Sequence, residues 1–306
     1  ASGRVAMPGR LAGADVAGFP AWGWGPGGRP PARGKVLMVF SPKGGTGCSC
    51  VAANLAIALH KTTSRKVALV DLCLQFGDVD AMLNLQGNRS LADVLAREDE
   101  LDGDLLEALM APHPSGIKAL AAPPSPEMAE RISGEQIKKV LSVMRGEFDY
   151  IVADTGSYLD EIVLAAMDVA DRLLLVLVPE IPSIKAVKQM FEIAEAMEFP
   201  AGQIDLVLNK VVPRDDIRAE QLENSLRHNI LAQLEFEPRS MRLAINQGLP
   251  LVLSQPNVPL AATFAEIGQQ LIELLAPKPA APAEVPVEAA RADRTKRVGL
   301  FGRLKK

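Results

Sequence analysis

KVLMVFSPKGGTGCSC, residues 35–50, joins an apolar run to a glycine-rich turn and then to the start of a helical pattern. This order is the setting of a phosphate-binding loop, in which backbone N–H groups and the positive end of a helix hold a polyphosphate. The usual motif is G-x-x-x-x-G-K-[ST]. Here Pro42 stands where the first glycine belongs and Cys48 where the lysine belongs, while Lys43 lies early in the turn. Taken alone, the turn is either an altered phosphate loop or an ordinary connection between a strand and a helix.

Apolar runs alternate with helical patterns along the rest of the chain. The predicted strands are 35–40, 66–70, 117–122, 149–154, 172–178, 204–210 and 233–237, and the clearest predicted helices are 48–60, 90–96, 134–144 and 184–197. Ser133 followed by Gln136 predicts a capping box at the start of the third of these helices. Runs too apolar to have one wet face indicate strands buried on both sides. The sequence therefore predicts an α/β fold with a doubly wound, mostly parallel sheet and helices on both faces.

Composition limits the class of protein. The 306 residues are 48% hydrophobic with a formal net charge of −4, which favours one large core and argues against specific nucleic-acid binding. No apolar run reaches the roughly 18 residues that span a bilayer. The three cysteines are an odd number and give no disulfide framework, so the expected location is the cytoplasm.

Composition also divides the chain. Residues 1–34 form a flexible Gly/Pro-rich lead-in, 35–275 the α/β domain, and 276–290 an Ala/Pro tether. Residues 291–306 form a basic amphipathic tail, with seven Lys or Arg residues around Val298, Leu300, Phe301 and Leu304. Such a segment can lie on an anionic membrane surface, although a disordered basic tail or a partner-docking peptide remains an alternative.

Three oxygen-bearing side chains are expected at one edge of the sheet. Asp71 and Asp154 end two buried strands, and Ser49 lies on the first turn of the helix that follows the glycine-rich turn. Ligands bind at the carboxyl edge of open α/β sheets, and these oxygens suit Mg²⁺. Any one of the acids could simply cap a helix. All three positions together favour a magnesium-nucleotide site.

A set of segments in fixed order resembles a known class. They are KGGTGCS (43–49), DLCLQFGDVD (71–80), SLADVL (90–95), LAAPPSPEMAE (120–130), FDYIVADTGS (148–157), VLVPEIPSIKAVKQ (176–189) and LVLNKV (206–211). Over residues 35–275 the chain resembles the MinD/ParA class of deviant Walker-A ATPases, which are P-loop NTPases. More narrowly it resembles the CpaE/TadZ branch, which is associated with tight-adherence (Flp-type) pilus assembly.

The resemblance implies a role for particular residues. In the class, the early lysine reaches across a nucleotide-sandwich homodimer to the partner's phosphates, a role that maps onto Lys43, and an asparagine that maps onto Asn209 reads adenine. The resemblance thus implies an ATP and Mg²⁺ site. The expected nucleotide-binding residues are Lys43, Gly44, Gly45, Thr46, Gly47, Cys48, Ser49, Cys50 and Asn209; the expected Mg²⁺ residues are Ser49, Asp154 and Asp71; the expected catalytic residues are Lys43 and Asp71.

Two departures from the class bear on hydrolysis. Cys48 replaces the second lysine, and Cys73 stands where the class usually has an acid that orients the attacking water. Losing charge stabilisation and losing positioning each commonly cost about 10²-fold in rate. Very slow or absent hydrolysis is therefore expected, unless Asp78 or Asp80 replaces the missing acid.

All three cysteines fall near the expected nucleotide site. The helix dipole is expected to lower the pKa of the Cys48 and Cys50 thiols, which leaves open a thiolate metal site or a redox switch that includes Cys73. Against this alternative, the spacing matches no standard zinc motif and no histidine lies nearby in the sequence.

Three functions remain in view. The first is an ATP-binding, dimeric positioning factor for a Flp-type pilus or related secretion machine, located in the cytoplasm and peripheral at the inner membrane or cell pole. The second is a MinD/ParA-like cycling ATPase that positions another cargo. The third is a pseudo-ATPase scaffold that binds partners without nucleotide.

Overall fold

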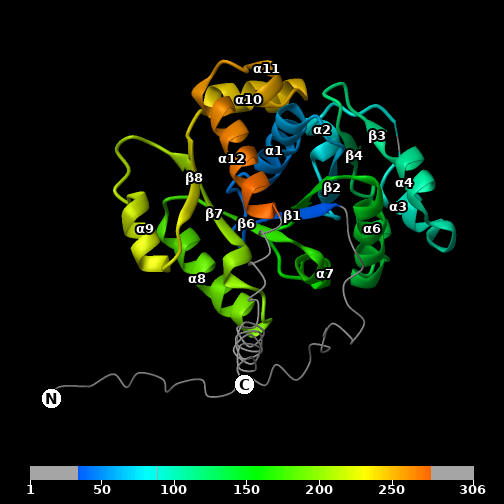
Figure 1. The fold of residues 1–306 in the computed structure, drawn as a ribbon, viewed down its shortest axis with the longest axis horizontal. Coiled ribbons are helices and arrows are strands. Elements are labelled where there is room, and N and C mark those ends of the chain that lie inside the picture. The colour runs from blue at the N-terminus through cyan, green and yellow to red at the C-terminus, as the bar shows by residue number, and fades with distance from the viewer. Residues whose placement is uncertain (1–33, 88, 277–306) are drawn as a thin grey trace, which may run out of the picture.

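A computed structural model describes residues 34–87 and 89–276 of the chain. The basic tail (291–306) lies outside the described residues, as do the lead-in and the tether except for their innermost residues, 34 and 276. The described chain forms one central sheet covered by helices on both faces (Figure 1).

The sheet contains eight strands in the order β3-β4-β2-β5-β1-β6-β7-β8. Their bounds are β1 Lys35–Phe40, β2 Val67–Leu72, β3 Ala111–Pro112, β4 Lys118–Leu120, β5 Tyr150–Thr155, β6 Arg172–Leu177, β7 Ile204–Val211 and β8 Ile230–Glu235. All neighbouring strands run parallel except β3, which pairs antiparallel with β4 at one edge. The predicted doubly wound, mostly parallel sheet is confirmed.

The central strands are buried on both faces, which explains why they read as continuous apolar runs. Along β1, Val36, Met38 and Phe40 pack into the core on one face, while Leu37 and Val39 pack into the core on the other. All five side chains are fully buried. Alternate residues of a strand point to opposite faces, so both faces need apolar residues here.

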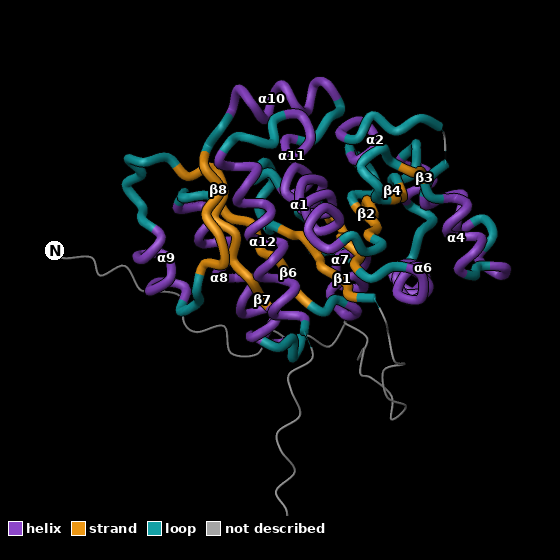
Figure 2. Tube along the Cα trace, turned by 45° about the horizontal axis from the view of Figure 1, so that its top comes forward, coloured by secondary structure: helices purple, strands orange, loops and turns teal. Residues whose placement is uncertain are grey.

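Each face carries its own group of helices. One core is built with α1 Cys48–Thr63, α2 Val79–Met82, α10 Pro238–Gln247, α11 Leu251–Ser254 and α12 Pro259–Leu275. The opposite core is built with α3 Leu91–Leu95, α4 Gly103–Leu109, α5 Pro126–Ala129, α6 Gly134–Glu147, α7 Glu161–Val169, α8 Ile181–Ala196 and α9 Ala219–Leu226. Two 3₁₀ turns, Glu98–Glu100 and Ala201–Gln203, complete the elements. Helices α1 and α12 lie side by side across the first face (Figures 1 and 2).

Local chemistry explains where the helices begin. The predicted capping box is present at α6, where the Ser133 hydroxyl accepts from the Gln136 N–H and the Gln136 side chain accepts from the Ser133 N–H. The sequence pattern misses the first turn of α8, which begins at Ile181 because Pro182 suits a first helical turn. The last predicted strand begins three residues and ends two residues earlier than expected, at Ile230–Glu235.

The strand order fixes where a ligand can bind. From β1 the chain winds outward to β2 and β4 on one side, and later elements add β6, β7 and β8 on the other. The reversal leaves the carboxyl ends of β1, β5 and β6 at the switch point of the sheet, where open α/β sheets bind ligands. Within the described ranges, no helix combines the length and apolarity needed to cross a membrane.

Candidate functional site

The glycine-rich loop connects β1 to α1 at this switch point. Gly45 and Gly47 have φ angles of 77° and 96°, in the left-handed region that favours glycine. A Cβ at position 47 would lie 2.6 Å from the Asn209 Nδ2, so a side chain there would also displace the Asn209 amide. The loop conformation therefore depends on glycine at both positions.

Helix α1 starts directly from this loop with its first amides free of a side-chain cap. Its N-cap is Gly47, and among the described residues no side chain caps it and no acid lies in its first turn. The first N–H groups of a helix have no partner within the helix and carry partial positive charge. Such a helix start is suited to bind an anion.

Strand register brings the two predicted acids to the loop. In the parallel pairing, Asp154 of β5 lies opposite Val39 of β1 and opposite Asp71 of β2. Strand β5 thus lies between the strand that enters the loop and the strand that carries the second acid. Residues more than 80 positions apart in the chain meet because their strands end at the same edge.

The Asp154 carboxylate is buried without compensation. The residue is fully buried, and neither carboxylate oxygen has a hydrogen-bond partner among the described residues. Burial, and then the nearby Asp71 charge, raise the pKa of Asp154 well above its usual value. The Ser49 hydroxyl lies near enough to lower this pKa in part, although it makes no hydrogen bond of regular geometry to either oxygen. A buried carboxylate of this kind is stabilised by a cation.

Asp71 has a different environment, although the sequence presents it in the same way. Its two oxygens accept from the Cys73 N–H at 3.0 Å and from the Val79 N–H at 3.1 Å. Burial raises its pKa to about 6, and these two hydrogen bonds partly offset the shift. A Cβ on Gly77 would lie 2.3 Å from an Asp71 oxygen, so the turn closes around the carboxylate. Asp71 therefore shapes the segment between β2 and α2, a role that the sequence pattern did not reveal.

The cysteine thiols are kept neutral. Burial raises the pKa of Cys48 to about 12 and those of Cys50 and Cys73 to about 11, and the Asp154 charge acts in the same direction. The expected lowering of the Cys48 and Cys50 pKa by the helix dipole is wrong, because desolvation outweighs it. All three are free cysteines, and the described residues contain no cluster of three His, Cys, Asp or Glu side chains suited to a metal.

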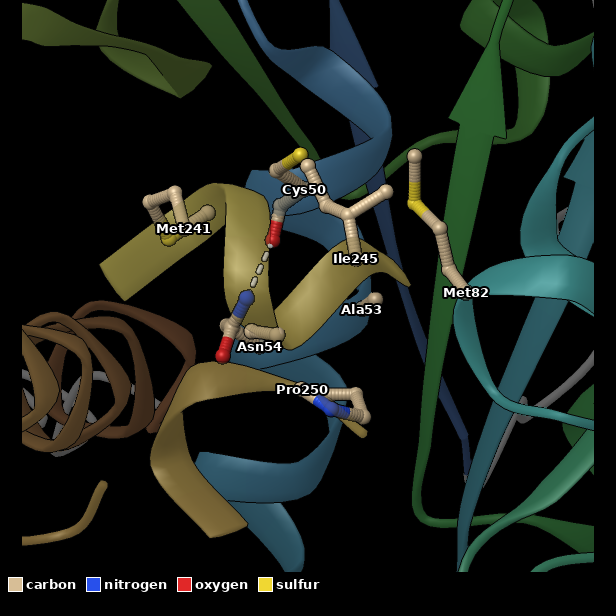
Figure 3. A pocket seen from close by; sticks show the side chains of 8 residues that line it. Cys50, Ala53, Asn54, Met82, Met241, Ile245 and Pro250 are labelled. Carbon is tan, nitrogen blue, oxygen red and sulfur yellow. Dashed lines mark hydrogen bonds between the residues drawn. The ribbon is translucent and has the colours of Figure 1, made fainter. Parts of the chain in front are cut away.

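Cys50 lines a small apolar cavity between α1, α2 and α10 (Figure 3). Met82, Met241 and Ile245 line it as well, and the Asn54 amide donates to the Cys50 carbonyl oxygen at 2.8 Å. The cavity volume of about 10 Å³ is near the minimum for one water molecule. The cavity is too small for a nucleotide, so a phosphate group would bind on the open loop and not here.

The end of β7 also contacts the glycine-rich loop. The Asn209 Nδ2 donates to the Thr46 carbonyl oxygen at 2.7 Å, and the Lys210 Nζ donates to the Gly45 carbonyl oxygen at 2.7 Å. The predicted adenine reader is thus bound to the loop itself. The sequence pattern does not single out Lys210, because only the fold brings it to the glycine-rich turn.

The remaining predicted residues take positions around the loop. Lys43 and Gly44 are exposed, and a Cβ on Gly44 would lie 3.6 Å from the Ser157 Oγ. Cys73, at the position of the expected water-orienting acid, lies beside Gly156, just beyond the end of β5. The structure thus brings the loop residues, Ser49, Asp71, Asp154 and Asn209 to one edge of the sheet.

A family model described as an AAA domain matches residues 34–200, more than half of the chain, and the chain belongs to this family. An uncharacterized ATP-binding protein of Methanocaldococcus jannaschii is 28% identical over 238 residues, which cover 77% of this chain and 87% of the relative. The septum site-determining protein MinD of Thermotoga maritima is 25% identical over 245 residues, covering 78% and 88%.

A solved structure supports the same class of protein. The ParA family ATPase of Chlorobium tepidum superposes with a TM-score of 0.73 at 25% identity, covering 77% of this chain and 98% of the other. The predicted membership of the MinD/ParA class of P-loop ATPases is therefore confirmed. The narrower assignment to the CpaE/TadZ branch stays a prediction.

The buried Asp154 carboxylate predicts whether one substitution raises or lowers the thermal stability of the protein. In EDTA, Asp154→Asn should raise the thermal midpoint by about 2–8 °C at pH 8, measured by calorimetry, because it removes a buried charge. The folded state binds the Asp154 proton more tightly than the unfolded state, whose pKa is near 3.8. Wild-type stability is therefore lost as pH rises above about 4, and the gain from the variant should vanish near pH 4.

A matched control is Asp205→Asn. Asp205 is buried against Arg172, with an Nη2–Oδ1 distance of 2.7 Å, so its substitution should lower the midpoint. A midpoint for Asp154→Asn below that of the wild type at pH 8 would show that the Asp154 carboxylate is already compensated.

Proposed function

We propose that this protein is an ATP-binding, dimeric localisation and assembly factor of a Flp-type pilus or a related secretion machine, with weak or absent ATP hydrolysis. The observation that carries the nucleotide part is the buried, unpartnered Asp154 carboxylate beside an uncapped helix N-terminus. One partner would satisfy both features: a polyphosphate on the amides, together with a divalent cation at the acid.

The residues present suit a magnesium nucleotide. The loop amides from Gly44 to Cys50 would hold the phosphates, and the Ser49 hydroxyl and Asp154 would hold Mg²⁺, Asp154 through water. Asp71 would act next to this site through the segment it orders, since both of its oxygens already accept backbone N–H groups. The ATP-binding description of the Methanocaldococcus relative supports ATP as the nucleotide.

Exposed apolar side chains around the loop support a dimer that covers this face. Phe76, Tyr158 and Ile181 follow the carboxyl ends of β2, β5 and β6, and they are 77%, 83% and 69% exposed. Lys43 is exposed on the same loop. Large exposed apolar side chains at one edge are typical of a surface that a second molecule covers. A second copy of the chain would bring its own Lys43 to this edge.

Two replacements support slow turnover. Cys48 supplies no positive charge, because a thiol is neutral and a thiolate is negative; burial raises its pKa and keeps the neutral form. Cys73 supplies no carboxylate where an attacking water would need orientation, and its thiol is neutral as well. Either loss removes a group that acts on the transition state.

The pilus assignment is supported by segments of the chain. LQFGDVD (74–80) and AAPPSPE (121–127) are the features that resemble the CpaE/TadZ branch. The basic tail (291–306) would add a peripheral contact with the inner membrane or cell pole, and secretion-machine proteins would be the partners. A MinD/ParA-like cycling ATPase is the alternative favoured by the relatives, and a nucleotide-free scaffold is the other.

Light scattering of the wild type with no nucleotide, MgADP and MgATP tests the dimer. The molar mass should double from the 32.7 kDa of one chain only with MgATP. Lys43→Ala should stay monomeric, because the partner's phosphates lose the lysine that crosses the interface. Lys188→Ala, which removes an exposed lysine on α8, is the matched control and should dimerise. One mass under all conditions would favour the scaffold alternative.

Phosphate release measures turnover. Purified protein with MgATP should release phosphate about 10²-fold or more slowly than an active ATPase of the class, because both Cys48 and Cys73 replace catalytic groups. The control is nucleotide binding in the same sample, which separates slow chemistry from a failure to bind. Fast release, or strong stimulation by a partner, would favour the cycling ATPase.

Lipid co-sedimentation tests the tail. Deleting residues 291–306 should abolish pelleting with anionic vesicles, since each basic residue near such a surface contributes about 1 kcal/mol. Neutral vesicles are the control and should retain little protein. If the deletion leaves pelleting with anionic vesicles unchanged, the tail is not the membrane contact.

A further inference from the structure

The side chains of two successive residues at the end of β7 donate hydrogen bonds to two successive carbonyl oxygens of the glycine-rich loop. Asn209 donates to the Thr46 oxygen and Lys210 to the Gly45 oxygen, each at 2.7 Å. The two donors lie more than 160 positions away from the loop in the chain. The loop thus has backbone acceptors that are satisfied by side chains of a different strand.

The backbone at the end of β7 is bent to make these contacts. Lys210 has a φ of 58°, in the left-handed region that non-glycine residues rarely adopt, and its N–H donates to the Asn209 Oδ1 at 2.8 Å. Strain of this kind persists only where the surroundings impose it. Gly47 completes the fit, because any Cβ there would collide with the Asn209 amide.

The loop itself lacks the ammonium group that its motif usually carries. At position 48 the side chain is a half-buried thiol that contacts the Thr46 hydroxyl at 3.6 Å. Lys43 is exposed, and its side chain makes no hydrogen bond to the loop among those found in the described residues. Among the described residues, Lys210 is the cationic side chain that donates a hydrogen bond to the loop backbone.

We propose that Asn209 and Lys210 form a clamp that holds the glycine-rich loop in its phosphate-binding shape, and that the Lys210 ammonium takes over the ordering role of the lysine missing at position 48. Both are positioning residues that act through the loop backbone. The clamp rests on the proposed nucleotide site for its purpose, but its effect on the loop exists without nucleotide. An exposed lysine on a carbonyl would by itself contribute little, and the strained backbone and the paired Asn209 contact distinguish this one.

The experiment compares Lys210→Met with Lys210→Arg, and uses Lys188→Met on α8 as the matched loss of an exposed lysine. Backbone hydrogen exchange of residues 43–50 is measured by mass spectrometry in the nucleotide-free protein. MgATP affinity is measured by calorimetry on the same preparations. Circular dichroism confirms that each variant is folded, which is expected because Lys210 is exposed.

Lys210→Met should speed exchange in the loop about tenfold and weaken MgATP binding about tenfold, since a charge-assisted hydrogen bond to the loop is lost. Lys210→Arg should keep both close to wild type, because a cation remains within reach. Cys48→Lys, placed in the Lys210→Met background, should restore slow exchange by returning an ammonium to the loop. Lys188→Met should change neither quantity.

Unchanged hydrogen exchange of the loop in Lys210→Met would overturn the clamp. Equal losses of MgATP affinity in Lys210→Met and Lys188→Met would also overturn it, because the loss of one positive charge would then explain the effect. A Cys48→Lys variant that folds but leaves exchange fast in the Lys210→Met background would overturn the replacement of the missing lysine. Wild-type protein that fails to bind MgATP, while Lys210→Met still loosens the loop, would reject the proposed function and leave the clamp standing.

Discussion

The parallel pairing of β1, β5 and β2 is the constraint on which the site depends. It fixes Asp154 opposite Val39, at the strand end that leads into the glycine-rich loop. Because β5 is covered on both faces, the Asp154 carboxylate near its end is buried, and no described residue makes a hydrogen bond to it. The sheet thus maintains an unfavourable buried acid at the one edge where free helix amides are also gathered, and this combination gives the site its chemistry.

Surroundings decide what similar side chains do. Asp71 and Asp154 both lie near the ends of buried strands and pair in register. Asp71 accepts two backbone N–H groups, whereas Asp154 accepts no hydrogen bond from the described part of the chain. The cysteines show the same point. Their place at a helix start suggests reactive thiols, but the low-dielectric surroundings raise the pKa of each one. In both cases burial outweighs the effect of position in the sequence.

The loop owes its shape to contacts on several sides. Left-handed glycines let it turn, β1 beside β5 leads into it, and side chains at the end of β7 donate to two of its carbonyls. A loop held in this way can depart from the usual motif at positions 42 and 48 and still present its amides together. The fold shared with MinD and ParA proteins at about 25% identity is consistent with this tolerance, since backbone amides need no particular side chain.

The sequence alone determined the sheet, the strands of its core and the loop, because two-sided burial leaves continuous apolar runs and a phosphate loop needs glycines at fixed spacing. It also placed Ser49, Asp71 and Asp154 at one edge. Only the tertiary structure separated the two acids, fixed the thiols as neutral and brought Lys210 to Gly45. Burial and hydrogen-bond partners depend on segments distant in the chain, and no local pattern records which of those segments will meet.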